Sequence, residues 1–260
     1  MKLLIKLGGS LLDSPADRLR LTGELAEVSR QHQTVIVHGG GKQMTRFLAE
    51  RGVESKFVDG LRVTSPEVVD AVLKVFAGTV NHELVASFVQ AGAMAVGLSG
   101  IDACMAEAEQ LREDLGAVGK IVRTDGKLLS LLSANGYLPV VACVAGNRSG
   151  QIFNVNADQM AVGCAAGFGA DRLLFLTDVD GVKGPQGLIS KLTPEDCKRL
   201  IREGIATGGM QAKLNAACDG LASGVGEVVI LPGARQRVVS GLLQGDAAGT
   251  RLVMENATHG

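Results

Sequence analysis

Two lysines, one aspartate and several glycine clusters are the residues of this chain whose types and spacing favour chemistry on a phosphate group. Lys6 lies in a short apolar run, residues 3–7, that stops at Gly8-Gly9. Such a run is typical of a buried parallel strand that leads into a tight turn. Paired glycines let backbone N–H groups approach a ligand, and the N-terminus of a following helix favours an anion. Taken alone, the stretch also fits a lysine that reaches solvent from an edge strand.

Polar groups also gather where two later elements begin. Asn154, Asn156 and Asp158 alternate between a predicted strand and a predicted helix. Lys213 follows the glycine pair at 208–209, in the first turn of another predicted helix. Each of these groups alone also fits a turn residue, a charge that favours the helix dipole, or a solvated surface lysine.

Several familiar enzyme motifs are missing from the sequence. It has no GxxxxGK[ST] phosphate loop and no GxGxxG fingerprint after a predicted strand. It also has no GxSxG nucleophile turn, no HExxH metal motif and no HRD or DFG kinase motif. A dehydrogenase, a serine hydrolase and a zinc enzyme are therefore disfavoured.

The elements that must position these residues alternate between strand and helix. This alternation, with glycine loops after strands, predicts an α/β fold with a mostly parallel sheet covered on both faces. Ligands bind such sheets beyond the carboxyl ends of the strands. An extended segment at 58–64, a hairpin excursion at 104–125 and a turn at 146–151 complete the prediction. Strands are predicted at 3–7, 34–37, 93–98, 138–143, 172–177, 227–231 and 250–254, and helices at 14–33, 42–51, 65–90, 127–135, 157–167, 193–203, 210–223 and up to 244.

Composition narrows the class of protein further. The 260 residues fit one large α/β domain or two lobes, and a composition of 46% hydrophobic and 20% charged residues is ordinary for a globular protein. Glycine stands out, with 35 residues against about 18 in an average chain of this length. The net charge of −1 argues against a nucleic-acid partner or a membrane surface.

The cysteines and the N-terminal stretch bear on location. Five separate cysteines form no CxxC pair and no zinc spacing, so we expect small buried hydrophobic residues. The first strand follows the initial methionine directly, and no apolar run is expected to reach membrane-spanning length. We therefore expect a cytoplasmic protein.

In their order and spacing, these segments resemble the amino-acid kinase family over nearly the whole chain. Each match alone is moderate evidence, whereas the ordered series is specific. The matching stretches are Lys6-Leu-Gly-Gly9, His38-Gly-Gly-Gly41, Asp59-Gly-Leu-Arg-Val-Thr64, Val96-Gly-Leu-Ser-Gly100, Gly136-Tyr-Leu-Pro-Val140, Asn154-Val-Asn-Ala-Asp158, Leu176-Thr-Asp-Val-Asp-Gly-Val182, Gly208-Gly-Met210 with Lys213, and Gly249-Thr-Arg251.

The resemblance implies a three-layer αβα sandwich around a mostly parallel open sheet. It implies an N-lobe at 1–172 for acceptor binding and dimerisation, and a C-lobe at 173–260 for ATP, on one continuous sheet. The implied reaction transfers the γ-phosphoryl group of ATP to the side-chain carboxylate of N-acetyl-L-glutamate, an early step toward arginine. A carboxylate with a pKa near 4.3 is already ionised at neutral pH, so no catalytic base is needed.

The resemblance also implies roles for individual residues. Lys6 and Lys213 stabilise the transition state, and Asp158 orients both ammonium groups. Mg²⁺ arrives on the ATP phosphates, with no dedicated protein ligand. Arg62 suits a bidentate grip on the α-carboxylate of the acceptor. The implied acceptor residues are Gly40, Gly41, Arg62 and Asn154, and the implied nucleotide residues are Gly8, Gly9, Asp178, Val179, Gly181, Val182, Lys183, Gly209 and Met210.

The chain departs from the family pattern at a few positions. Lys42-Gln43 follows the triple glycine where relatives often carry Pro-Gln, Gln211-Ala212 precedes Lys213, and Ile101 replaces a common lysine. The first of these departures bears on the acceptor pocket.

The position of the first strand bears on the expected oligomeric state and on inhibition by arginine. The first strand begins at residue 2 or 3, so the added N-terminal helix of arginine-inhibited hexamers has no room. We therefore expect an arginine-insensitive homodimer. Two alternatives stay open: a sister kinase acting on an aminoadipate-type acceptor, including one presented by a carrier protein, and a non-catalytic ligand sensor on the same fold.

Overall fold

The computed structural model describes residues 1–254, which fold around one eight-stranded sheet in the order β14-β16-β15-β11-β1-β2-β8-β5. Neighbouring strands are parallel except for the antiparallel pair β15–β16. The prediction of a mostly parallel sheet is therefore confirmed. The strands are β1 (Lys2–Leu7), β2 (Gln33–His38), β5 (Met94–Ser99), β8 (Tyr137–Ala142), β11 (Arg172–Thr177), β14 (Lys191–Leu192), β15 (Glu227–Pro232) and β16 (Thr250–Leu252).

Strand β1 lies at the centre of this sheet. It pairs with β11 on one side and with β2 on the other, and its apolar side chains are fully buried. The alternative reading of Lys6 as a lysine on an edge strand is therefore wrong. The sheet also runs without a break across the predicted lobe boundary at 172–173, where β11 begins.

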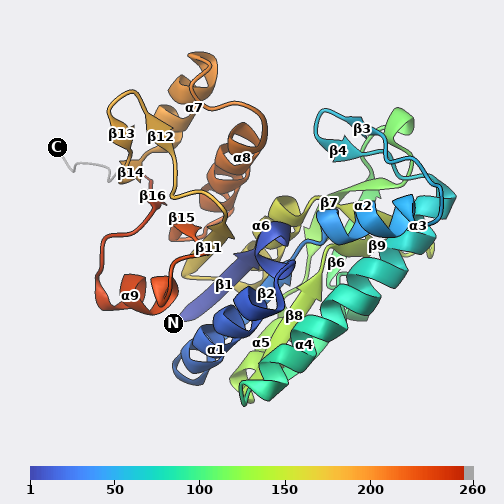
Figure 1. Ribbon diagram of the computed structural model, residues 1–260, viewed down its shortest axis with the longest axis horizontal. Coiled ribbons are helices and arrows are strands. Elements are labelled where there is room, and N and C mark those ends of the chain that lie inside the picture. Colours follow the sequence, from blue (N-terminus) through green and yellow to red (C-terminus); the bar gives the residue numbers. More distant parts are fainter. Residues whose placement is uncertain (255–260) are drawn as a thin grey trace.

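Helices cover both faces of the sheet, so the predicted three-layer αβα sandwich is confirmed (Figure 1). One layer holds α1 (Pro15–Gln31), α4 (Asn81–Gln90) and α9 (Val238–Gln244). The opposite layer holds α5 (Lys127–Ala134), α6 (Ala157–Phe168) and α8 (Gly208–Ala222), with α7 (Pro194–Arg202) packed on α8. In Figure 1 the carboxyl ends of the central strands point between two groups of smaller elements, one on each side.

Local signals explain where the helices begin. The hydroxyl of Ser14 accepts a hydrogen bond from the N–H of Asp17 at 3.3 Å, and a proline follows the cap. Ser65 caps α3 (Pro66–Val72) in the same way, through the N–H of Val68 at 3.4 Å. A hydroxyl cap followed by proline is the preferred start of a helix.

The helix predicted from residue 65 to 90 is continuous but not uniform. A π-helical segment, η2 (Leu73–Val80), joins α3 to α4. The continuous stretch Pro66–Gln90 has 25 residues and contains an 18-residue window with a mean hydropathy of 1.2, so by length and composition it could cross a membrane. The expectation that no apolar run reaches this length is therefore wrong, although Val72, Phe76 and Phe88 pack in the core.

Two smaller β structures rise beside the carboxyl ends of the strands. The hairpin predicted at 104–125 is confirmed as β6 (Ala106–Gln110) and β7 (Val118–Thr124). The sequence did not indicate that β9 (Val144–Gly146) and β10 (Ile152–Val155) would join this hairpin in a closed four-stranded sheet.

The segment predicted as extended at 58–64 is instead a hairpin, formed by β3 (Phe57–Val58) and β4 (Leu61–Arg62). Its turn is Asp59-Gly60, with φ values of 52° and 78°. An Asp-Gly pair with positive φ at both residues is the preferred two-residue turn of a hairpin, so the signal was present in the sequence.

The cysteines largely follow the prediction that they are small buried residues. Cys143, Cys164 and Cys197 are buried, whereas Cys104 and Cys218 are half-buried, and all five thiols are free.

The remaining elements are short. They are η1 (Gly9–Leu12), α2 (Gly41–Ala49), η3 (Asp102–Cys104), η4 (Glu113–Leu115), β12 (Lys183–Gly184) and β13 (Gly187–Leu188).

Candidate active site

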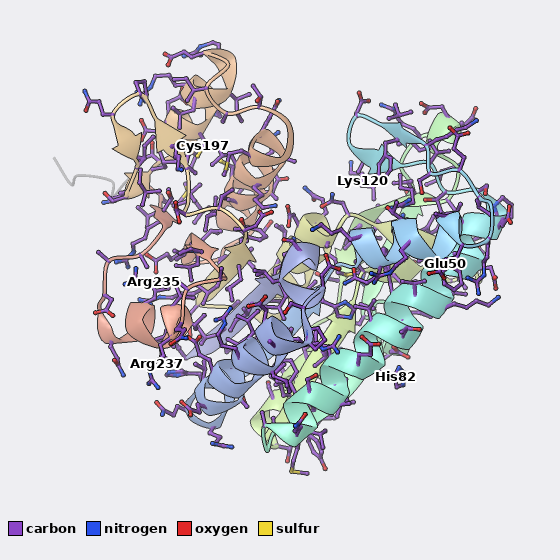
Figure 2. The ribbon with its side chains drawn as sticks, in the orientation of Figure 1. Glu50, His82, Lys120, Cys197, Arg235 and Arg237 are labelled. Carbon is purple, nitrogen blue, oxygen red and sulfur yellow. The ribbon has the colours of Figure 1, made fainter. Side chains whose placement is uncertain are left out.

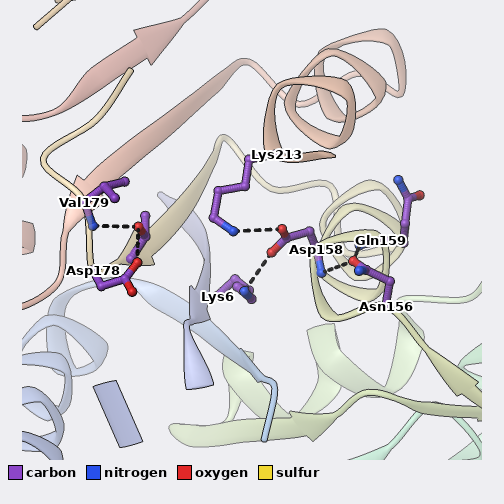
Figure 3. A network of polar contacts seen from close by, with 8 residues as sticks. Lys6, Asn156, Asp158, Gln159, Asp178, Val179 and Lys213 are labelled. Carbon is purple, nitrogen blue, oxygen red and sulfur yellow. Dashed lines mark hydrogen bonds and ion pairs between the residues drawn. The ribbon is translucent and has the colours of Figure 1, made fainter. Parts of the chain in front are cut away.

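Asp158 holds two lysines that come from distant parts of the chain (Figure 3). Its Oδ1 lies 2.7 Å from Nζ of Lys6, and its Oδ2 lies 3.1 Å from Nζ of Lys213. Lys6 comes from β1, Asp158 from the first turn of α6 and Lys213 from α8. Helix α8 begins at Gly208, so Lys213 belongs to its second turn and the prediction of the first turn is wrong.

Asp158 is buried and ionised. Burial alone would raise the pKa of its carboxyl group, but Lys6 and Lys213 outweigh this effect and hold that pKa below its usual value. Asn156 fixes the backbone at this position, because its Oδ1 accepts the N–H of Asp158 at 2.9 Å and that of Gln159 at 3.3 Å. No role was predicted for Asn156 from the sequence, although Asn before a helix is a preferred cap.

Two glycine loops meet beside this charged group. Gly9 follows β1 and Gly40 follows β2, and these two strands are parallel neighbours. A Cβ atom on Gly9 would lie 3.4 Å from N of Gly41 and 3.6 Å from N of Gly40. Gly41 is the first residue of α2, so the N–H groups at that helix N-terminus face the same space.

A cavity of about 750 Å³ opens over the charged group. Lys6, Asp158 and Lys213 lie in its wall, together with Gly209 at the N-terminus of α8. The tip of the β3–β4 hairpin, at Asp59 and Gly60, also lines this cavity. Two ammonium groups and a helix N-terminus therefore face one solvent-filled space, which suits a polyanion.

The predicted acceptor residues line an adjoining cavity of about 160 Å³, in which Gly40, Gly41, Arg62 and Asn154 all take part. Nδ2 of Asn154 donates to Oγ1 of Thr64 at 3.1 Å, and that hydroxyl donates to the carbonyl of Arg62 at 2.8 Å. The structure therefore brings the four predicted acceptor residues together.

The guanidinium of Arg62 is partly committed inside the protein. It donates to the carbonyl of Gly41 at 3.1 Å, to Oγ1 of Thr45 at 2.8 Å and to Oγ of Ser55. Burial lowers its pKa, yet an arginine remains charged at any ordinary pH. A guanidinium has five N–H donors, so the Nε–H and one Nη1–H have no part in these three contacts.

The predicted nucleotide residues fall into two groups that do not share one cavity. Gly8 and Gly9 lie in the first glycine loop, and Gly209 and Met210 lie in the first turn of α8. The segment 178–183 lies after β11, where Asp178 lines a separate cavity of about 350 Å³ and Val182 is buried.

The segment 178–183 is held by hydroxyl groups. The N–H of Val179 donates to Oγ1 of Thr177 at 3.0 Å, and the N–H of Val182 donates to Oγ1 of Thr250 at 2.8 Å. Gly181 has a φ of 141°, and a Cβ there would lie 2.7 Å from that Thr250 oxygen. Lys183 is exposed, with Nζ 3.8 Å from Asp180. Thr250 is a second residue that sequence reasoning left without a role.

Comparison with known proteins gives the class. A statistical model of the amino acid kinase family matches residues 1–232, and the chain belongs to this family. Two relatives within the family are similar over nearly their whole length. An acetylglutamate kinase of Solibacter usitatus is 60% identical, over 97% of this chain and 99% of the relative. An acetylglutamate kinase of Koribacter versatilis is 40% identical, again over 97% of this chain and 99% of the relative.

Solved structures agree with this class. An N-acetylglutamate synthase of Neisseria gonorrhoeae, complexed with coenzyme A and N-acetyl-glutamate, has a TM-score of 0.85 and 25% identity. The similarity covers 98% of this chain but only 60% of that longer synthase chain. A carbamate kinase of Giardia lamblia bound to AMP-PNP has a TM-score of 0.72 at 16% identity, over 98% of both chains, and shows the shared fold.

Proposed function

We propose that this chain transfers the γ-phosphoryl group of ATP to the side-chain carboxylate of N-acetyl-L-glutamate, giving N-acetyl-L-glutamyl 5-phosphate for arginine biosynthesis. The 60% identity with an acetylglutamate kinase supports the substrate pair. The observation that carries the chemistry is the pair of lysines, Lys6 and Lys213, held on one buried carboxylate in the wall of the main cavity.

The reaction must bring one anion onto another. The acceptor carboxylate is ionised at neutral pH and attacks without a base. Charge then accumulates on the transferring phosphoryl group, and Lys6 and Lys213 are placed to stabilise it. Asp158 orients both ammonium groups, and its lowered pKa keeps it an anion and not a proton donor.

Alignment comes from the glycine loops and the acceptor cavity. The N–H groups of Gly9 and Gly41 would bind phosphoryl oxygens, whereas the N–H predicted for this role at Gly8 donates instead to the carbonyl of Leu176 at 2.9 Å. Arg62 would bind the α-carboxylate through a remaining N–H donor, and Asn154 would bind the same end of the acceptor. Holding both reactants in line adds to the stabilisation of charge, and these two effects supply most of the catalysis of phosphoryl transfer.

The nucleotide is proposed to lie on the C-lobe, residues 173–260, against Gly209, Met210 and the segment 178–183. Within residues 1–254, no three His, Cys, Asp or Glu side chains are grouped to hold a metal ion. The Mg²⁺ of the reaction is therefore proposed to be bound by the ATP phosphates. The N-lobe, residues 1–172, would bind the acceptor.

The test is ATP-dependent formation of an acyl phosphate, trapped with hydroxylamine. N-acetylglutamate, N-acetyl-2-aminoadipate, free glutamate and aspartate would be compared as acceptors at equal concentration. We expect a clear preference for N-acetylglutamate. Turnover only on the longer acceptor would move the chain to the aminoadipate branch, and no turnover on any acceptor would favour a ligand sensor.

We also propose a cytoplasmic homodimer that pairs through the edge of the sheet. β5 is the outermost strand on the N-lobe side, and apolar side chains are exposed on this strand and on two helices of the same lobe: Met94 of β5 is 60% exposed, Val89 of α4 is 55% and Leu131 of α5 is 63%. An apolar edge strand of this kind favours association. Light scattering should give a dimer mass, and Met94→Lys should shift it toward the monomer. A monomeric wild type would contradict the proposal.

A further inference from the structure

The buried histidine at the end of β2 has no role in the reaction proposed above. His38 is fully buried, and both of its ring nitrogens have partners. Nδ1 lies 2.8 Å from the carbonyl oxygen of Gly39, and Nε2 lies 3.0 Å from Nδ2 of Asn81. Asn81 is itself buried, at the first residue of α4.

The partners of Asn81 determine which nitrogen of His38 carries the proton. Nδ2 of Asn81 also donates to the carbonyl oxygen of Val140 at 2.9 Å. Because a carbonyl only accepts, the amide nitrogen must face it, and its second N–H then points at Nε2 of His38. Nε2 is therefore an acceptor, and Nδ1 carries the proton that is donated to Gly39.

Fixing the carbonyl of Gly39 also fixes the next N–H. The carbonyl of Gly39 and the N–H of Gly40 belong to one planar trans peptide unit and point in opposite directions. With the carbonyl turned toward His38, the N–H of Gly40 is turned away from the ring. Its nitrogen lies near Gly9, at 3.6 Å from where a Cβ on that residue would be.

The side chain of Phe76 packs against the Cα of Gly40. A Cβ on Gly40 would lie 2.9 Å from Cδ1 of Phe76, a residue of the π-helical segment that precedes Asn81. The loop is therefore held between Phe76 on one side and the His38–Asn81 pair on the other. We propose that neutral His38, oriented by Asn81, is a positioning residue. It keeps the N–H of Gly40 aimed at the space between the two glycine loops, where the anionic groups of the substrates would lie.

This inference rests on the proposed kinase function, and the electrostatics of the ring agree with it. Burial lowers the pKa of His38 to about 4, and the hydrogen bond to Gly39 opposes that shift only in part. The packed elements carry ionisable groups at Lys6, Cys143, Asp158 and Glu83, and none of these groups contributes to the shift. The ring is therefore neutral from pH 6 to pH 9, and its titration leaves the wild-type kcat unchanged there.

The sharpest test is Asn81→Asp, which keeps the shape but replaces a donor by an acceptor. A carboxylate beside Nε2 favours a proton on that nitrogen. At low pH the charged imidazolium still donates to Gly39, but at high pH its single remaining proton goes to the carboxylate and Gly39 loses its donor. We expect a kcat that falls by about 100-fold as the pH rises in this variant, the cost of a misdirected oxyanion donor.

Variants of His38 separate positioning from packing. His38→Asn keeps an N–H donor near the position of Nδ1 and should retain kcat within about tenfold, whereas His38→Leu has no donor and should lose about 100-fold. His82→Asn is the matched control, because His82 bonds a carbonyl on the exposed side of α4 and points away from the sheet (Figure 2). Its kcat should equal that of the wild type.

The ring nitrogens give a readout that does not depend on activity. The ¹⁵N shifts of histidine-labelled wild type should show a neutral ring protonated at Nδ1, and a ring that is charged or protonated at Nε2 would overturn the inference. It would also be overturned if Asn81→Asp gave the wild-type pH profile and His38→Leu kept its kcat. A wild type inactive on every acceptor would refute the proposed function, while the ring tautomer would still decide the geometry.

Discussion

Lys6 and Asp158 form an ion pair of 2.7 Å in which the two side chains are only 8% and 9% exposed. Removing two charges from water is costly, and an apolar pair of similar volume would often be as stable. Stability alone therefore does not account for this pair. Loss of one partner, by contrast, leaves an uncompensated buried charge, which is strongly destabilising.

Asp158→Asn should be strongly destabilising, although asparagine has nearly the same shape as aspartate. The variant leaves the ammonium of Lys6 buried without an anion, so we expect the free energy of unfolding to fall by about 3 kcal/mol at pH 7. Urea denaturation measures this loss. Asp70→Asn is the control, because Asp70 pairs with Lys74 on the surface and is 62% exposed. Its loss should stay below about 1 kcal/mol, and equal losses in both variants would contradict the account.

The same carboxylate predicts a pH dependence. The pKa of Asp158 is lowered in the folded protein, so its contribution to stability is present above the unfolded value of about 3.9 and is lost as the pH falls through the folded value. The difference in unfolding free energy between wild type and Asp158→Asn should be largest near neutral pH and shrink in acid. A difference that stays constant from pH 7 to pH 3 would exclude this linkage.

Arg62→Lys should weaken binding of the acceptor through its α-carboxylate. A lysine cannot reproduce the fork of a guanidinium, so KM for N-acetylglutamate should rise about 10- to 100-fold. 4-Acetamidobutyrate, which lacks the α-carboxylate, provides the control acceptor. Wild type and variant should differ little on it. Equal losses on both acceptors would mean that Arg62 acts only through its contacts with Gly41 and Thr45.

Thr250→Val should act on the nucleotide and not on the acceptor. The valine keeps the volume but leaves the N–H of Val182 without the hydroxyl that it meets at 2.8 Å. We expect KM for ATP to rise about tenfold, with KM for N-acetylglutamate unchanged and with Thr250→Ser close to wild type. Failure of the serine variant to restore KM would argue against this hydrogen bond.

Much of the fold could be predicted, because periodicity and glycine placement are local. The central strands and the cap at Ser14 follow from neighbouring residues alone. The strands β9 and β10 pair with each other across the predicted turn, but their pairing with β6 and β7, which lie earlier in the chain, could not be predicted in this way. The turn at Asp59-Gly60 had a local signal in the Asp-Gly pair, but the segment 58–64 was predicted as extended throughout.

The site was predictable only as a set of candidates. Nothing local to Lys6 or Lys213 indicates that they share one carboxylate, and the family resemblance supplied that expectation. Asn156 and Thr250 had no assigned role because each acts through a backbone N–H, and the partner of Thr250 lies far away in the sequence. Supporting contacts of this kind become visible only when the fold brings the segments together.

The role of the two lysines is tested by comparing kcat for Lys6→Ala and Lys213→Ala with that of the wild type, on N-acetylglutamate and saturating ATP. Lys198→Ala is the control, because Lys198 is 69% exposed on α7, where it pairs with Glu195 at 3.4 Å. We expect each site variant to lose at least about 100-fold in kcat, with the control unchanged. Site variants that retain kcat within about threefold would contradict the claim that these two lysines stabilise the transferring phosphoryl group.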